Sequence, residues 1–302
     1  MKEKIGFIGL GVMGHSMASH ILDAGYPLYV YNRTKSKADG LIAKGATWCG
    51  SPAETARQSD IIFTIVGFPK DVEEVYLGEK GIVSALSEGK CAVDMTTTRP
   101  SLMLEIEKAC MEKGASFADA PVSGGDRGAR EATLTFMTGC SDETFERIRP
   151  LLSIMGKSIN HCGPVSSGQQ TKMCNQIVIA GTMIGVSEAL VYGAQAGLRL
   201  KDMVRTISGG AAGCWTLDNL APRVIRGDYE PGFMIDHFVK DMGLALEESE
   251  KMGLCLPGLA LVKQLYIALQ AQGMGRNGTQ ALVKALEAVT GRNILKQEEE
   301  NA

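Results

Sequence analysis

The stretch after Lys4 constrains this chain more than any other. An apolar run, Ile5 to Ile8, enters a G-x-G-x-x-G turn, a helical pattern follows, and a second apolar run spans Leu28 to Tyr31. In a strand–turn–helix–strand unit the first glycine permits the tight turn and the second lets the backbone approach a pyrophosphate. The third lets the helix pack closely on the strand. The unit predicts that a dinucleotide is bound by Gly9, Leu10, Gly11, Val12, Met13 and Gly14.

The end of the second apolar run indicates which dinucleotide binds. An NAD-selective site usually has Asp or Glu about twenty residues beyond the glycines, but this chain has Asn32, Arg33 and Thr34 there. These residues offer no carboxylate to repel a 2′-phosphate, and Arg33 can clamp or stack on one. We therefore expect NADP to be preferred. If Arg33 is only a solvated surface arginine, NAD serves as well.

Composition excludes several other classes of protein. A chain of 302 residues is long enough for two domains, and a net charge of −3 argues against a nucleic-acid surface. The longest apolar stretch, residues 177–186, contains glycines and is closed by Glu188, so we judge it too short for a membrane span. The charged start Lys2-Glu3-Lys4 runs straight into the glycine turn, so no cleaved leader is expected.

The cysteines and histidines predict neither disulfides nor a metal site. The eight cysteines form no C-x-x-C pair and no zinc-type cluster with histidine, so we expect buried thiols in a reducing compartment, the cytoplasm. The four histidines are scattered along the chain. The residues concerned are Cys49, Cys91, Cys110, Cys140, Cys162, Cys174, Cys214 and Cys255, and His15, His20, His161 and His237.

The hydrophobic pattern changes character along the chain. The first half alternates strand-like runs at 61–66, 91–95, 116–120 and 134–139 with helical segments such as 100–113, which is typical of a Rossmann-type, doubly wound parallel α/β sheet. From residue 169 only helical patterns follow, at 169–197, 200–208, 217–226, 235–252, 258–272 and 280–290. We predict a dinucleotide-binding domain over 1–163, an all-α domain over 164–292 and an acidic, frayed tail over 293–302.

Three further segments can carry chemistry. Asp119-Ala120-Pro121-Val122-Ser123-Gly124-Gly125 follows a strand, where open α/β sheets hold ligands and where a serine beside glycines can form a nest for a carboxylate. Lys172 lies at the start of the long helix near the domain junction, and Asn175 follows on the same helix face. The pair Lys240-Asp241 lies in a later helix.

Together these motifs resemble the β-hydroxyacid dehydrogenase family, of which 3-hydroxyisobutyrate dehydrogenase is a member. The resemblance covers residues 5–290 and rests on four motifs in order: G-L-G-V-M-G, D-A-P-V-S-G-G, G-x-x-x-K-x-x-N and K-D. It implies that Lys172 is the general acid/base and that Asn175 assists it. It further implies that Ser123, Gly124 and Gly125 hold the substrate and that Phe68, Pro69, Thr97 and Lys240 contact the cofactor.

Elementary chemistry agrees with that role for Lys172. Hydride transfer leaves an alcohol proton to be moved, so one positioned acid/base is required and no metal is needed. A lysine between two domains and near a nicotinamide cation has its ammonium form disfavoured. One departure from the family pattern is Ala132, where the family usually has a glycine.

The resemblance implies an oxidoreductase that moves hydride between nicotinamide and a small β-hydroxyacid or its semialdehyde. Candidate substrates are 3-hydroxyisobutyrate, tartronate semialdehyde, succinic semialdehyde and glyoxylate, and the sequence does not choose among them. The alternatives are a 6-phosphogluconate dehydrogenase-like enzyme, an imine reductase-like enzyme, or a non-catalytic dinucleotide sensor or scaffold. The first class runs longer and has a histidine next to the asparagine, which Cys174-Asn175-Gln176 does not match. Lys172 argues against the second class, and retention of Lys172, Asn175 and Lys240 disfavours the third. By analogy we expect a homodimer or homotetramer, with no nucleic-acid or membrane partner.

Overall fold

The computed structural model describes residues 2–293, and the chain divides into two compact units. Unit 1 comprises Met1–Lys172 and unit 2 comprises Met173–Ala302. The division falls inside the first turns of the long helix α8 (Ser167–Gln195), beyond the boundary expected at residue 163. The tail expected from residue 293 lies, except for Asn293, outside the described residues.

Unit 1 is built on one nine-stranded sheet. The strand order is β3-β2-β1-β4-β5-β6-β8-β7, and β9 pairs with β8. The pairs β2–β1, β1–β4, β4–β5 and β5–β6 are all parallel, so the carboxyl ends of these strands meet at one edge. The strands are β1 (Ile5–Ile8), β2 (Leu28–Tyr31), β3 (Thr47–Trp48), β4 (Ile61–Thr64), β5 (Cys91–Asp94), β6 (Ser116–Asp119), β7 (Val122–Ser123), β8 (Leu134–Gly139) and β9 (Gly156–Gly163).

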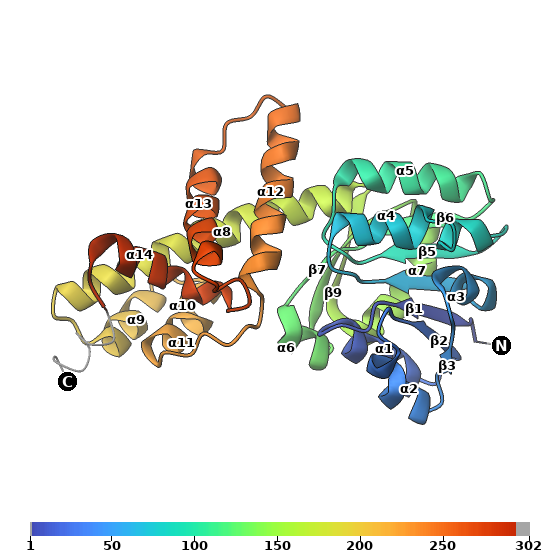
Figure 1. Cartoon of the computed structure of the whole chain (residues 1–302), viewed down its shortest axis with the longest axis horizontal. Coiled ribbons are helices and arrows are strands. Elements are labelled where there is room, and N and C mark those ends of the chain that lie inside the picture. Colours follow the sequence, from blue (N-terminus) through green and yellow to red (C-terminus); the bar gives the residue numbers. More distant parts are fainter. Residues whose placement is uncertain (1, 294–302) are drawn as a thin grey trace. The chain divides into compact units, whose positions relative to one another are not determined.

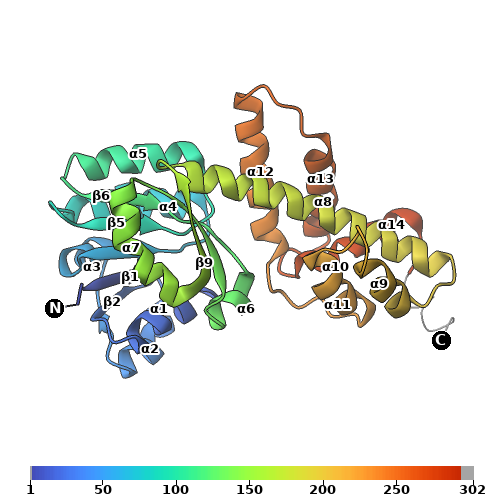
Figure 2. The same cartoon turned by 180° about the vertical axis from the view of Figure 1, so that it is seen from behind.

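Helices cover both faces of this sheet. In Figure 1, α4 and α5 lie over one face and α1 and α2 over the other, and α7 packs beside α1, as Figure 2 also shows. The apolar strands are buried from both sides, which explains their continuous hydrophobic runs. The helices of unit 1 are α1 (Gly14–Asp23), α2 (Asp39–Ala43), α3 (Pro52–Gln58), α4 (Pro69–Leu77), α5 (Pro100–Met111), α6 (Gly125–Arg130) and α7 (Asp142–Met155), with 3₁₀ helices η1 (Lys35–Ala38) and η2 (Ile82–Ala85).

The far edge of the sheet differs from the all-parallel expectation. Strand β8 runs antiparallel to β6 and β7, and β9 then pairs parallel with β8. Strand β9 was not expected, because its sequence, GKSINHCG, is mostly polar and half-exposed and gives no apolar run. The Rossmann-type class holds, and the mixed edge is an addition to it.

All the elements of unit 2 up to residue 293, where the described part of the chain ends, are helices. Two apolar clusters form its interior, one between α8 and helices α12 to α14, and one between the later part of α8 and α9 to α11. Its further helices are α9 (Leu200–Ser208), α10 (Trp215–Asn219), α11 (Ala221–Ile225), α12 (Ile235–Lys251), α13 (Pro257–Ala271), the 3₁₀ helix η3 (Thr279–Ala281) and α14 (Leu282–Thr290). The helix expected over 217–226 is two helices, because Pro222, the second residue of α11, supplies no backbone N–H to continue α10.

Helix α8 corrects one expectation about the membrane. Its 29 residues are long and apolar enough to span a bilayer by length and composition, so the stretch is not too short, as the sequence had suggested. Its inward side, including Met173, Ala180, Met183 and Leu190, is buried in the clusters of the chain itself. That packing accounts for the apolar character of the inward side.

The cysteines correct another expectation. All eight thiols are free, and Cys49, Cys91, Cys110 and Cys140 are buried as expected. The other four are not: Cys162 and Cys214 are partly exposed, and Cys174 and Cys255 are exposed. Composition alone does not tell which face of a helix a cysteine occupies. Among the residues that the structure describes, no three His, Cys, Asp or Glu side chains are grouped as metal ligands.

Candidate active site

The glycine turn after β1 has the geometry that a dinucleotide site requires. Gly9 has φ +97°, and a Cβ there would collide with the carbonyl oxygen of Ile65. A Cβ on Gly14, the first residue of α1, would collide with the Gly9 carbonyl oxygen. A Cβ on Gly11 would meet nothing within 4 Å. Two of these glycines are therefore needed by the fold, whereas Gly11 leaves open space beside the N-terminus of α1.

This contrast yields a testable difference between two alanine variants. Gly11→Ala should leave the thermal midpoint within about 2 °C of wild type, because neither space nor φ opposes the methyl group. It should weaken NADPH binding at least about tenfold, because the methyl group would occupy the path of the pyrophosphate. Gly9→Ala should fail to fold stably. Thermal melts and fluorescence titration with NADPH test both, and wild-type affinity in Gly11→Ala would refute the site.

The segment after β2 lies beside the glycine turn. The Leu10 N–H donates to Asn32 Oδ1 at 2.9 Å, so the asparagine side chain holds the turn. Arg33 is 83% exposed, and its Nη1 lies 3.0 Å from Asp71 Oδ1. Asp71 also accepts the Phe68 N–H at the start of α4. An exposed ion pair of this kind contributes under about 1 kcal/mol, so Arg33 is held in place loosely and can take another anion.

Hydrogen bonds join the loops after β4 and β5, which carry Phe68, Pro69 and Thr97. Asp94, at the end of β5, accepts from Thr64 Oγ1 at 2.6 Å and from Thr96 Oγ1 at 2.8 Å. The Thr96 hydroxyl in turn accepts the Val66 N–H. Phe68 is exposed and Thr97 partly exposed at this edge. The two loops are therefore fixed to each other beside the glycine turn.

Lys172, the expected acid/base, contacts the loop after β6 that is expected to hold the substrate. Lys172 is only 6% exposed, and its Nζ donates to the Val122 carbonyl oxygen at 2.8 Å. Val122 begins β7, and Ser123 and the two glycines follow directly. The ammonium group therefore lies against the backbone of the loop that we expect to hold a carboxylate. Both belong to unit 1.

A buried carboxylate anchors the start of the helix that carries Lys172. Asp119 Oδ1 accepts the Ser166 N–H and Oδ2 accepts the Gln169 N–H, each at 2.7 Å. These N–H groups at the N-terminus of α8 would otherwise have no partner. Burial raises the pKa of Asp119 to about 7, although the hydrogen bonds from Ser166 and Gln169 act in the opposite direction. Asp119 thus holds the start of α8 at the end of β6.

The Gln169 side chain ties the same helix to a second strand end. Its Oε1 accepts the Thr98 N–H at 3.0 Å and its Nε2 donates to the Thr96 carbonyl oxygen at 2.6 Å. Gln169 is fully buried. The first turn of α8 is therefore bonded to the loop after β5 and to the end of β6, and Lys172 follows one turn later.

Asn175 and Lys240 belong to unit 2 and are linked there. The Asn175 amide donates to Gln176 Oε1 at 2.7 Å, and Gln176 Nε2 donates to Asp241 Oδ2 at 2.6 Å. Lys240 Nζ lies 3.1 Å from Asp241 Oδ1. The structure thus joins Asn175 and Lys240, which the sequence treats separately, through two buried side chains.

Sequence reasoning assigned no role to Asp119, Gln169, Gln176 and Asp241. One signal was available for Asp119: two neighbouring strands each end in aspartate, and Asp94 and Asp119 are register partners. A carboxylate at the end of a buried strand needs a partner nearby. At Ala132 the structure gives φ +52°, a conformation that favours the glycine the family usually has there.

Comparison with known proteins agrees with this geometry. A family model described as the NAD binding domain of 6-phosphogluconate dehydrogenase matches residues 4–163. A second, described as "NAD-binding of NADP-dependent 3-hydroxyisobutyrate dehydrogenase", matches residues 166–286. The probable 3-hydroxyisobutyrate dehydrogenase-like 1 of Arabidopsis thaliana is 49% identical over 292 residues, covering 96% of this chain and 87% of that protein.

Two further proteins are similar over nearly their full length. The NAD-dependent L-serine dehydrogenase of Pseudomonas aeruginosa is 35% identical, covering 96% of this chain and 100% of that protein. The structure of Mycobacterium tuberculosis 3-hydroxyisobutyrate dehydrogenase with L-serine has a TM-score of 0.87 at 29% identity, covering 95% of this chain and 99% of that one.

The protein is thus an NAD(P)-dependent oxidoreductase with a Rossmann-type domain and a helical domain. More narrowly, the chain belongs to the 3-hydroxyisobutyrate dehydrogenase family of hydroxyacid dehydrogenases, which confirms the resemblance seen in its motifs.

Proposed function

We propose that this protein interconverts a small β-hydroxyacid and its semialdehyde with NADP as preferred cofactor and Lys172 as general acid/base. The observation that carries the proposal is the buried Lys172 ammonium, 2.8 Å from the backbone of the Ser123 loop. A substrate carboxylate held by Ser123, Gly124 and Gly125 would bring the reacting carbon, one to three bonds from the carboxylate carbon, toward Lys172. The substrates in view are 3-hydroxyisobutyrate and the semialdehydes of tartronate and succinate, with glyoxylate as a short analogue.

Each residue of the proposed site has a separate role in the reaction. Bound nicotinamide would supply or accept the hydride. Lys172 as the neutral amine would take the hydroxyl proton during oxidation and become the ammonium form, which would give the proton to the carbonyl oxygen during reduction. Asn175 would orient the hydroxyl group. Ser123 and the neighbouring backbone would bind the carboxylate. The residues fit a dinucleotide: Gly11 leaves open space, and α1 has no acidic residue in its first turn.

The first experiment is an absorbance assay at 340 nm. Purified protein would be offered NADPH or NADH with succinic semialdehyde, glyoxylate, tartronate semialdehyde and methylmalonate semialdehyde. Turnover of one semialdehyde, faster with NADPH, would support the proposal. Measurable cofactor binding without turnover of any of the four would count against this substrate class and favour a dinucleotide sensor.

Arg33 gives the cofactor preference its own test. Arg33→Ala should raise the KM for NADPH by about 10- to 100-fold, because it removes a charge-assisted bond to the 2′-phosphate. The KM for NADH should change less than about threefold, because NADH has no such phosphate. Arg57→Ala, on the exposed end of α3, is the matched control. Equal losses with both cofactors would contradict the preference for NADP.

We also propose that the protein is a homo-oligomer whose subunits meet along one face of α8. The exposed residues of one face of this helix recur every three to four positions; they are Cys174, Val178, Gly181, Gly185, Glu188 and Tyr192. A Cβ on either glycine would meet nothing within 4 Å, so the fold of the chain itself does not need them. Glycine inside a helix costs about 1 kcal/mol relative to alanine, and a second helix at close range would explain two of them one turn apart.

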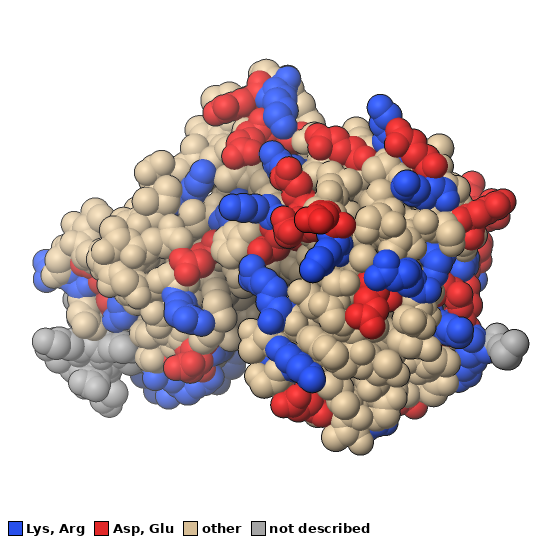
Figure 3. Space-filling view, turned by 45° about the vertical axis from the view of Figure 1, so that its right-hand side comes forward, with Lys and Arg blue, Asp and Glu red and all other residues tan. Residues whose placement is uncertain are grey.

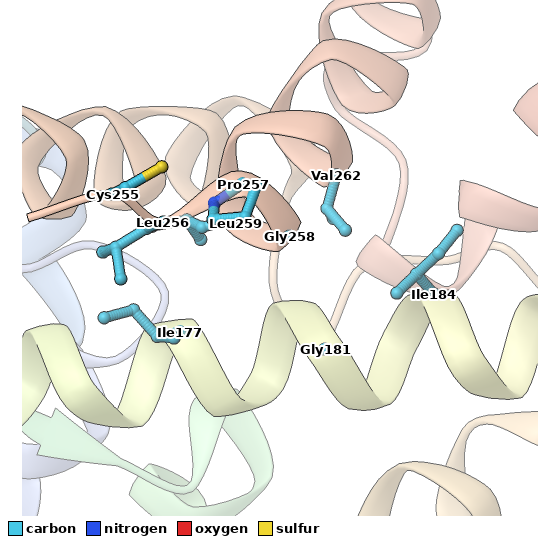
Figure 4. Close-up of a pocket in the computed structure, with 9 residues that line it drawn as sticks. All are labelled: Ile177, Gly181, Ile184, Cys255, Leu256, Pro257, Gly258, Leu259 and Val262. Carbon is cyan, nitrogen blue, oxygen red and sulfur yellow. The ribbon is translucent and has the colours of Figure 1, made fainter.

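An apolar pocket continues this face. It has a volume of about 270 Å³ and lies between α8 and the start of α13 (Figure 4). Gly181, Ile177 and Ile184 form its α8 side, and Leu256, Pro257 and Val262 are among the residues opposite. Charged groups are absent from its lining. A second copy of the chain would cover both the pocket and the glycines.

Gly185→Arg should therefore reduce the oligomer to a monomer. The arginine has open space in the isolated chain but would be forced against a partner helix. Light scattering should report a mass near 32.2 kDa for the variant and a multiple of it for wild type. Glu250→Arg, at an exposed position of α12, should leave the mass unchanged. A monomeric wild type would overturn the proposed interface.

A further inference from the structure

Unit 2 contains a row of hydrogen-bonded side chains that ends at Asn175. Lys240 lies 3.1 Å from one oxygen of Asp241, whose other oxygen accepts from Gln176 at 2.6 Å, and Gln176 accepts from Asn175 at 2.7 Å. Asp241 and Gln176 are 2% and 1% exposed. Buried polar side chains are costly unless each donor meets an acceptor, so the direction of every bond in this row matters.

The direction is set from the Asp241 end. A carboxylate beside an ammonium group only accepts hydrogen bonds, so Gln176 must turn its NH₂ group toward Asp241. The side-chain carbonyl oxygen of Gln176 then faces Asn175 and accepts a hydrogen bond from the Asn175 NH₂ group. Asn175 is therefore oriented with its NH₂ group toward Gln176, and its own oxygen is directed elsewhere.

We propose that Asp241 and Gln176 are positioning residues that fix the amide orientation of Asn175. Since Asn175 spends one N–H on Gln176, its second N–H is held in a fixed orientation to donate to the substrate hydroxyl oxygen, whose single proton goes to Lys172. This assignment deepens the proposed function and rests on it for the identity of the ligand. It gives the two buried residues a chemical task that differs from filling space.

Exchanging the Asp241 carboxylate and the Gln176 amide tests the direction of the hydrogen bonds in this row. In Asp241→Asn, the amide oxygen stays with Lys240 and its NH₂ group faces Gln176, so Gln176 and Asn175 both reverse. In the double variant Asp241→Asn, Gln176→Glu, the new amide donates to the new carboxylate, which again accepts from Asn175. The double variant thus restores the original orientation of Asn175 with the same net charge. Gln176→Glu alone places two carboxylates together and should lower the thermal midpoint.

The chain offers a closely matched control. Gln270 Nε2 donates to Asp236 Oδ1 at 2.6 Å. This bond has the same chemistry and length as the bond from Gln176 to Asp241, but it is partly buried, joins α13 to α12, and does not involve Asn175. Asp236→Asn, and its double variant with Gln270→Glu, should leave kcat/KM within about twofold of wild type. Asp241→Asn should lower kcat/KM at least about tenfold, and its double variant should recover to within about threefold.

A readout that needs no turnover keeps this inference separate from the proposed function. With selective ¹⁵N-asparagine labelling of the full chain, the side-chain NH₂ signals of Asn175 are assigned by their loss in Asn175→Ala. These signals should shift in Asp241→Asn and return in the double variant. Unmoved signals in Asp241→Asn, or a folded double variant without recovery, would overturn the inference. If wild type turns over no substrate, the proposed function fails while the Asn175 signals still decide the orientation.

Discussion

Lys172→Met should lower kcat by about a thousandfold, because it removes the group that we propose moves the substrate proton. The side chain is buried and donates to the Val122 carbonyl oxygen at 2.8 Å. Methionine has similar length and fills the same space, so the loss should not come from misfolding. Steady-state kinetics in both directions, with a thermal melt of each protein, measure the effect.

Two controls sharpen this test. Lys108→Met removes an exposed lysine from α5 and should leave kcat unchanged. NADPH binding to Lys172→Met should remain within about threefold of wild type, because the contacts proposed for the cofactor do not include this side chain. A variant that keeps more than about a tenth of wild-type kcat would show that another group moves the proton.

Asp119→Ala should destabilise the protein by about 4 kcal/mol. Two N–H groups at the start of α8, one partly buried and one buried, would lose their acceptor, at about 2 kcal/mol each. Asp60→Ala is the matched control, because Asp60 also accepts a backbone N–H, from Lys4 at 2.8 Å, but at an exposed site. Urea unfolding should show a loss below about 1 kcal/mol there. Similar losses at both sites would contradict the anchoring role of Asp119.

The raised pKa of Asp119 predicts that the free energy of unfolding depends on pH. Burial raises the pKa of Asp119 to about 7 from an ordinary value of 3.8. Between these values the folded protein holds a proton that the unfolded chain has lost, so this group stabilises most at low pH and less as pH rises toward 7. The unfolding free energy of wild type should therefore fall between pH 5 and pH 8 by more than that of Asp119→Asn, which cannot titrate. Parallel pH profiles would contradict the raised pKa.

The parts of this protein that could be predicted from sequence are those with local causes. The glycine at position 9 predicts a tight turn, and the structure has φ +97° there. The continuous apolar run at β4 predicts a strand that is buried on both faces. Helix α9 begins and ends where its periodicity predicts. The roles of Lys172 and Asn175 remain predictions, although the structure places Lys172 against the expected loop.

The parts that could not be predicted depend on partners far away in the chain. Asp119 finds its donors 47 and 50 residues later, and Gln176 meets Asp241 65 residues later. No local pattern encodes such pairs, because each residue alone is typical of a loop end or a helix interior. The exposed Cys174 was mistaken for a buried thiol for the same reason: its neighbours are set by the packing of α8 rather than by its own sequence.

The space around the Asp119 carboxylate has a consequence for how this sequence can change over time. A Cβ on Gly139 would meet Asp119 Oδ1 and the Gly168 N–H, and a Cβ on Gly168 would collide with the Met137 carbonyl oxygen and Asp119 Oδ2. The two glycines and the aspartate therefore constrain one another, because a side chain on either glycine would need space that the Asp119 carboxylate occupies. A library randomised at positions 139 and 168 should return folded variants with glycine at both, because the backbone carbonyl oxygens of Pro164 and Met137 remain whatever residue replaces Asp119.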